Sequence, residues 1–218
     1  MSDAPLEVAV KLIPQSQIVE FAEVARRRRW AITFLLLGWW HLVAFSACWY
    51  LTNVVHYNGS PGYLAIWFTE LAGMGLLFRL VGGPRSLPVK PLEATVQRIW
   101  IAYFVLAFNL GSLNTLRGHA MFEFFPAIAT LASFAFILMT VLVDGRFFLA
   151  VLVMFASGLL MAANFLHAFG IFAVAWWIVL EGIGGYMLWV ERRAHFFAGS
   201  ARTASSTATS APTAGTSM

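Results

Sequence analysis

Charged side chains are scarce in this chain. Asp, Glu, Lys and Arg make up 11% of the 218 residues, whereas hydrophobic residues make up 60%. Soluble domains usually carry about 25% charged residues. The mean hydropathy of +0.77 agrees with this shortage of charge. An ordinary soluble protein is therefore excluded, and the composition predicts an all-α integral membrane protein.

Cysteine and lysine are nearly absent. Cys48 is the one cysteine, and the two lysines are Lys11 and Lys90. A single cysteine excludes an intramolecular disulfide, a CxxC metal site and an iron–sulfur cluster held by cysteines. With no lysine in an apolar run, a retinal Schiff base has no attachment point there. The chain also lacks a nucleophile elbow, an HExxH pair and a Walker loop, so no common class of membrane enzyme is indicated.

The apolar residues are gathered into six runs, each near the roughly 20 residues that a membrane-crossing helix needs. The runs are 31–52, 63–80, 99–113, 124–143, 147–166 and 168–190. We therefore expect a six-helix transmembrane domain over residues 30–193. A cytoplasmic segment with a polybasic run, 1–29, precedes this domain. The tail 194–218 consists mainly of Ala, Ser and Thr, and it is predicted to be disordered.

Basic residues predict the orientation of the six runs. They precede run one, lie at or between runs two and three, separate runs four and five, and follow run six. Arg117 alone falls on the opposite side. By the positive-inside rule both termini are cytoplasmic, and the expected location is the cytoplasmic (inner) membrane of a bacterium, as a multi-pass protein. The same rule makes the run from Arg26 to Arg29 a topology anchor in preference to a nucleic-acid patch, so no nucleic-acid partner is expected.

Three ionisable residues lie near the middle of apolar runs: His41, Glu70 and Glu181. At about 1.5 Å of rise per residue, all three come near the bilayer midplane. Intramembrane ionisable residues are costly and mark functional sites by default, so the three are candidates for a proton or cation site. The alternative is that each Glu is protonated and only hydrogen-bonds between helices.

Each acid has a tryptophan before it and a glycine after it. Trp67 and Gly73 flank Glu70, and Trp177 and Gly184 flank Glu181. A glycine one turn away allows a neighbouring helix to approach closely. The indole N–H lies on the same helix face as the acid, where it can reach the carboxyl group.

The other polar residues near the membrane give weaker candidates for a site. His56, His119 and His167 fall at the outer ends of the runs and are candidate metal or haem ligands. Their spacing matches no zinc motif, so no cofactor is favoured. Asn109 and Asn164 are candidates for lining a polar cavity, although hydrogen bonding between helices also accounts for them.

One resemblance concerns the C-terminal third of the chain. The stretch from Phe124 through Pro126 to Phe136, together with Leu159-Leu-Met161-Ala, resembles the multi-helix membrane regions that follow the kinase domain in some bacterial serine/threonine kinases. This chain has no kinase domain, so the resemblance implies no catalytic activity. It implies a membrane-anchored sensory or partner-binding unit.

Two functions from different classes follow from these residues. The first is a non-enzymatic membrane subunit or sensory/scaffold module that packs in the lipid bilayer with a partner membrane protein or with copies of itself. The second is a small proton- or cation-coupled transporter that uses Glu70, Glu181 and His41. A haem- or metal-binding redox protein is a third alternative.

Overall fold

The computed structural model describes residues 23–57, 59–82, 91–120 and 122–209, with no side-chain detail at 60, 190 or beyond 191. The described part is 89% helical and contains no strand. Its elements are α2 (Trp30–Asn53), α3 (Ser60–Gly82), α4 (Pro91–Leu116), α5 (Phe125–Leu142), η2 (Gly145–Phe147), α6 (Phe148–Ala163), η3 (Phe165–His167) and α7 (Ala168–Thr209).

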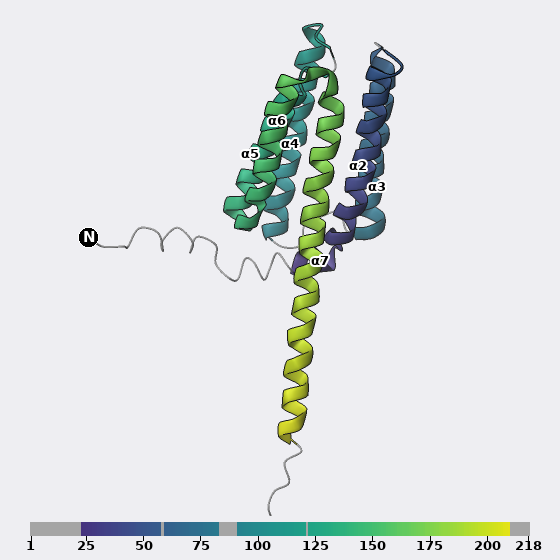
Figure 1. The fold of residues 1–218 in the computed structure, drawn as a ribbon. Coiled ribbons are helices and arrows are strands. Elements are labelled where there is room, and N and C mark those ends of the chain that lie inside the picture. Colours follow the sequence, from purple (N-terminus) through teal and green to yellow (C-terminus); the bar gives the residue numbers. More distant parts are fainter. Residues whose placement is uncertain (1–22, 58, 83–90, 121, 210–218) are drawn as a thin grey trace, which may run out of the picture.

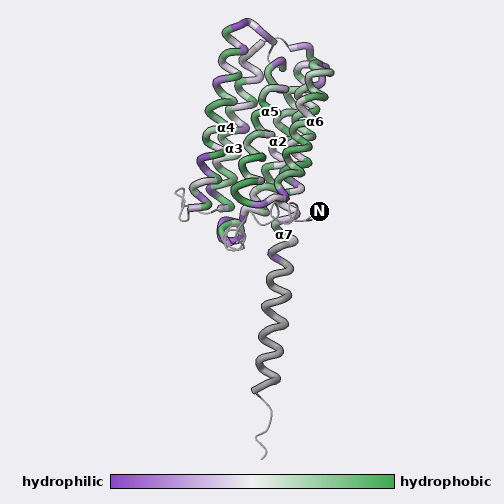
Figure 2. Tube along the Cα trace, turned by 90° about the vertical axis from the view of Figure 1, so that its left-hand side faces the viewer, coloured by the Kyte–Doolittle hydropathy of each residue, from purple (hydrophilic) through white to green (hydrophobic). Residues whose placement is uncertain are grey.

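Six of these helical segments are long and apolar enough to cross a membrane, which confirms the number expected from the sequence. The third differs most from its expected range, because it begins at Pro91 and not at residue 99. Its extra two turns contain Glu93 and Arg98, so hydropathy alone does not reveal them. Figure 2 shows hydrophobic residues along the bundle and hydrophilic residues mainly toward its two ends.

The helices form two groups that α7 joins (Figure 1). Helices α2 and α3 lie on one side, α4, α5 and α6 lie on the other, and α7 runs between them. The most extensive contact is between α2 and α7, which run antiparallel. Glycines permit this close approach, since a Cβ added at Gly184 would lie 2.9 Å from the Ala31 carbonyl oxygen. One added at Gly170 would lie 3.2 Å from the ring of Trp49.

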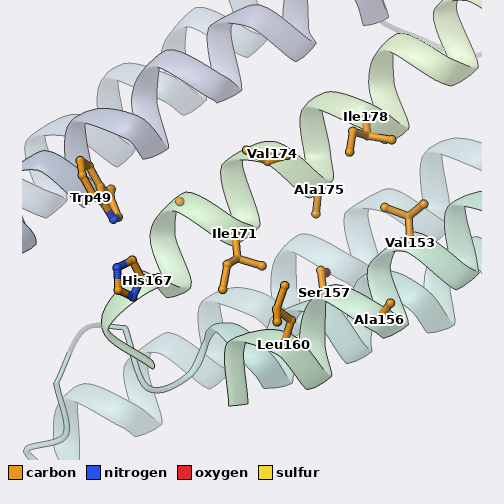
Figure 3. A pocket seen from close by; sticks show the side chains of 11 residues that line it. Trp49, Val153, Ala156, Ser157, Leu160, His167, Ile171, Val174, Ala175 and Ile178 are labelled. Atoms are coloured by element: carbon orange, nitrogen blue, oxygen red, sulfur yellow. The ribbon is translucent and has the colours of Figure 1, made fainter. Parts of the chain in front are cut away.

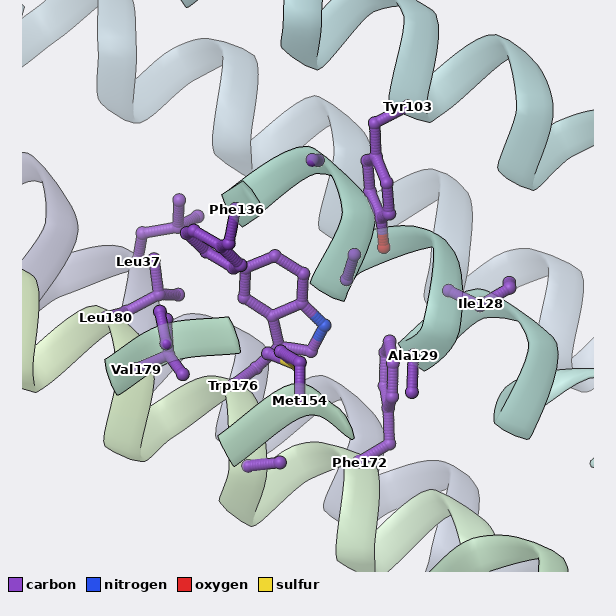
Figure 4. Packing of buried hydrophobic residues seen from close by; sticks show 14 of the residues in the cluster. Leu37, Tyr103, Ile128, Ala129, Phe136, Met154, Phe172, Trp176, Val179 and Leu180 are labelled. Carbon is purple, nitrogen blue, oxygen red and sulfur yellow. The ribbon is translucent and has the colours of Figure 1, made fainter. Parts of the chain in front are cut away.

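Burial is uneven among the helices. In the most apolar stretch of each helix, 44% of the residues are buried for α5 and for α7, but only 6% for α3. The core therefore lies between α2, α5, α6 and α7, and aromatic rings fill it. Trp176 is at its centre, with its ring centroid 5.8 Å from that of Phe136 and 6.1 Å from that of Tyr103 (Figure 4).

The ends of the helices use local polar contacts. Pro126 occupies the first turn of α5, where a helix needs no N–H from it. Asp144 begins the turn into α6 by accepting a hydrogen bond from the Arg146 backbone N–H at 2.9 Å. The hydroxyl of Tyr186 donates to the other oxygen of Asp144 at 3.3 Å. This contact ties the α5–α6 turn to α7 at one end of the bundle.

The same end carries an ion pair that hydropathy did not reveal. Glu93 is buried at the start of α4, and its carboxylate lies 2.7 Å from Nη2 of Arg28 and 3.3 Å from Nη2 of Arg27. We call this end, with Arg27, Arg28 and Arg146, the basic end. The ion pair fastens the segment just before α2 to the start of α4, and so it joins the two helix groups.

Helix α7 continues past the bundle at the basic end and reaches Thr209 (Figure 1). The tail predicted to be disordered is thus helical over 194–209, while 210–218 lie outside the described residues. Alanine has the highest helix propensity of all residues, and extending an existing helix needs no new nucleus. The prediction of disorder used the composition of the tail alone, and it did not consider that α7 could extend into the tail.

Candidate midplane site

His41 and Glu70 contact each other directly. Nδ1 of His41, on α2, lies within hydrogen-bonding distance of Oε1 of Glu70, on α3. Only 13% of the His41 side chain and 10% of the Glu70 side chain is exposed. A contact between these two atoms needs a proton, which either group can donate. The structure therefore brings together two of the three intramembrane residues that the sequence indicated.

Aromatic rings surround the His41 side of this pair. The His41 ring centroid lies 4.4 Å from that of Phe45, 5.6 Å from that of Trp176 and 5.7 Å from that of Phe172. The other ring nitrogen of His41, Nε2, is buried and has no hydrogen-bond partner. Among these rings an unpaired polar group is costly, so the contact with Glu70 stabilises the imidazole in this position.

A second tryptophan, which is not part of the Trp–Glu–Gly pattern in the sequence, fixes the helix that carries Glu70. The indole N–H of Trp40 donates to the backbone carbonyl of Glu70 at 3.2 Å. Its ring fills the space beside Gly73, where an added Cβ would lie 2.5 Å from the indole. The spacing predicted that Gly73 allows a neighbouring helix to approach closely. The group that approaches it is the side chain of Trp40. The signal in the sequence was that Trp40 directly precedes His41.

Trp67 does not reach the carboxyl of Glu70 as its spacing suggested. Its buried indole nitrogen does not bond to an oxygen acceptor, and the thiol of Cys48 lies beside the Trp67 side chain. The ring instead packs edge-on against Phe124 and Phe125, at centroid distances of 5.9 and 6.2 Å. This contact connects α3 to the far side of the bundle. The prediction considered only residues on α3. It could not take account of Phe124 and Phe125, which belong to another segment and pack against the indole in place of the carboxyl.

Glu181 lies elsewhere, on the surface between α7 and α2. Its Oε1 is 3.0 Å from the place where a Cβ of Gly38 would be. That oxygen is buried and accepts no hydrogen bond, although the side chain as a whole is only partly buried. No contact joins Glu181 to Glu70 or to His41 within the described residues. Gly38 is one turn before His41, so the two sites are neighbours along α2.

Among the described residues, the three histidines at the far end of the bundle do not form one metal-binding group. His56 is exposed, with a left-handed φ of 53° just after α2. His119 pairs with Glu123, with 2.8 Å between Nδ1 and Oε2. His167 is exposed in η3. No group of three or more His, Cys, Asp or Glu side chains suited to a metal occurs among the described residues.

Asn109 and Asn164 also lie apart. Asn109 is exposed on α4, and Asn164 is exposed at the end of α6, where its Nδ2 donates to the Leu160 carbonyl at 3.2 Å. Neither lines the groove that the structure shows between α6, α7 and Trp49 (Figure 3). This groove has a volume of about 540 Å³ and apolar walls, with His167 and Ser157 as its polar side chains apart from the Trp49 indole.

Comparison with known proteins gives no family. No protein-family model, no curated protein and no solved structure matches this chain. The resemblance of the C-terminal helices to membrane regions of bacterial kinases therefore stays a prediction.

Proposed function

We propose that this chain is a non-enzymatic multi-pass membrane module, a subunit or sensory/scaffold unit, that packs against a partner protein in the bilayer. The proposal places it in the cytoplasmic membrane with both termini in the cytoplasm. The clustering of Arg27, Arg28 and Arg146 at one end of the bundle supports that orientation, since basic residues favour the cytoplasmic side.

The observation that carries the proposal is the position of α3. This helix packs chiefly on α2, and 6% of its most apolar stretch is buried. Its specific contacts with the rest of the bundle include the His41–Glu70 pair, the Trp40 hydrogen bond, the hydrogen bonds of the Tyr63 hydroxyl with Thr52 and Tyr57, and the ring contacts of Trp67, Tyr63 and Phe78. A helix held by a few specific contacts presents a whole face to a partner.

The exposed face of α3 suits the approach of another helix. A Cβ added at Gly75 would meet no atom within 4 Å, and Ala72, one turn earlier, is exposed as well. Helices pack closely in membranes where small residues let the backbones approach. Large apolar side chains, including Phe68 at 69% exposure and Leu71 at 49%, lie beside these two positions.

Gly75→Leu tests this proposal because the new side chain leaves the chain's own packing unchanged. We expect the complex extracted from its native membrane in polymer-bounded lipid particles to lose its partner in this variant, as measured by particle mass. Gly182→Leu is the matched control, since Gly182 on α7 also has open space around it. A particle that contains only copies of this chain, or equal masses for both variants and wild type, would contradict the proposal.

A proton-coupled transporter is the second candidate, and the buried atoms without partners favour it. Nε2 of His41 and Oε1 of Glu181 are both buried without a hydrogen-bond partner, and Gly38, which Glu181 faces from α7, lies one turn before His41 on α2. Together with Glu70 they provide three proton-binding groups near the midplane. In proteoliposomes, Glu70→Gln and Glu181→Gln should each abolish pH-driven flux. If both variants affect only thermal stability, the acids serve packing.

A further inference from the structure

Asn109 differs from the other asparagines whose side chains the structure describes. Nδ2 of Asn53 donates to the carbonyls of Trp49 and Leu166, Asn114 donates to Ala120, and Asn164 donates to Leu160. Asn109 has no such contact, and its side chain is exposed. Its neighbours on α4 contrast with it, because the hydroxyls of Ser112 and Thr115 bond back to carbonyls of their own helix.

The depth of Asn109 makes an unpaired amide costly. The residue lies seven positions before the end of α4 at Leu116. At about 1.5 Å per residue this is roughly 10 Å from the helix end, and the residue lies inside the apolar run 99–113 that is expected to cross the hydrocarbon. Unpaired hydrogen-bonding groups in hydrocarbon cost several kcal/mol in general, so they are found paired.

The face that carries Asn109 points away from the bundle. Tyr103 and Asn114 are buried on the side of α4 toward α5. On the opposite side Ile101, Val105 and Phe108 are 53%, 62% and 79% exposed. These three residues and Asn109 recur at helical spacing, and we call them the outer face of α4. It is an apolar strip with one amide in it.

We propose that two copies of this chain associate through the outer face of α4, with the two Asn109 amides hydrogen-bonded to each other. An amide is self-complementary, because it has both an N–H donor and a carbonyl acceptor. Copies in one membrane have the same orientation, so a twofold axis is normal to the bilayer and equivalent residues meet at equal depth. A second copy therefore brings an identical amide to the level of the first.

This inference rests on the membrane insertion that the proposed function assumes. It concerns the outer face of α4, whereas the proposed partner binds the exposed face of α3 around Ala72 and Gly75. The two therefore fail separately. A chain that dimerises yet shows no effect of Gly75→Leu supports the α4 interface alone. A chain that remains monomeric after reconstitution, while Gly75→Leu still reduces the native particle mass, supports the α3 face alone.

The test is the dimerisation of purified, fluorescently labelled protein in liposomes over a range of protein-to-lipid ratios, read by energy transfer between copies. Wild type should dimerise, and Asn109→Leu should weaken dimerisation about tenfold, as expected from interhelical bonds of about 1–2 kcal/mol in model peptides. Asn109→Gln, which keeps the amide, should retain most of the affinity. Asn164→Leu is the matched control and should leave it unchanged, because the Asn164 amide bonds within its own chain.

Two results would overturn the proposal. One is a wild-type protein that stays monomeric at every ratio, which would assign the face to a different protein or to lipid. The other is equal affinity for wild type and Asn109→Leu. Leucine is apolar and faces lipid in the monomer, so the variant should keep its helical circular dichroism and its melting temperature. A lower dimer affinity of Asn109→Leu would therefore not come from misfolding of the variant.

Discussion

Glu70 and Glu181 are both acids near the middle of helices that are long and apolar enough to cross a membrane, yet their surroundings differ. The carboxyl of Glu70 is buried against His41, and Trp40 fixes the backbone beside it. The carboxyl of Glu181 faces Gly38, partly exposed and with one buried oxygen unpaired. The first acid thus links two helices through a specific contact, whereas the second fills the space that a glycine leaves. Similar flanking residues do not imply a similar role.

Removing one member of the buried pair should have the largest effect. Glu70→Ala leaves His41 buried without its partner, and breaking a buried pair in this way costs about 3–5 kcal/mol in known proteins. The free energy of unfolding in mixed micelles measures the loss. The double variant His41→Phe, Glu70→Leu should recover part of it, because no polar group then remains unpaired. Additive losses in the double variant would show that the two residues do not act together.

Substitution of Gly73, the glycine beside Glu70, should cause the second-largest loss of stability. In Gly73→Ala the new Cβ would overlap the Trp40 indole at 2.5 Å, so the ring has to move and its bond to the Glu70 carbonyl is disturbed. Overpacking of this kind costs about 1–3 kcal/mol. Gly182→Ala, where no atom lies within 4 Å, controls for the effect of the methyl group on helix propensity. Equal thermal stability of the two variants would remove Trp40 from the site.

The glycine beside Glu181 should be more tolerant. A Cβ in Gly38→Ala lies 3.0 Å from Oε1 of Glu181, which is the end of a flexible side chain that can turn away. We expect a loss below about 1 kcal/mol, at the low end of overpacking. Thermal unfolding of Gly38→Ala and Gly73→Ala side by side compares the two acid sites directly. A larger loss at Gly38 would reverse their ranking.

Neutralising Glu181 should have the smallest effect on folding. Glu181→Gln keeps the shape of the side chain and removes no ion pair, so the expected change in unfolding free energy is within about 0.5 kcal/mol. Glu70→Gln, measured in parallel, should cost clearly more because it alters the contact with His41. If instead Glu181→Gln is the more destabilising of the two, the unpaired oxygen has a partner in the membrane-inserted protein.

Much of the architecture was predictable because apolar length is a local property. The six spans follow from runs of hydrophobic residues, and turn residues such as Asp144 and Gly145 mark where the chain reverses. The start of α4 was missed because Glu93 interrupts the apolar pattern. Its charge is compensated by contacts with Arg27 and Arg28, more than sixty residues away. Such contacts leave no trace in a hydropathy profile.

The candidate site was predictable in part. Depth along each helix placed His41, Glu70 and Glu181 near one level, and two of them do meet. The rotation of each helix about its axis determines which side chains face each other. The spacing of residues along one helix does not predict that rotation. Glycine spacing correctly indicated close approaches at Gly73 and Gly184, but it did not identify what approaches. At one position it is an indole ring, and at the other it is the backbone of α2.

The sequence by itself determined that this is an all-helical chain with six membrane-length spans and few ionisable residues within them. Hydrophobic length and the cost of charge in hydrocarbon are enough for that result. Only the tertiary structure separated Glu70 from Glu181, paired the former with His41, and left Asn109 on an outward face. The physical reason is that helix rotation and neighbour choice depend on packing between distant segments, where small residues and rings determine which faces meet.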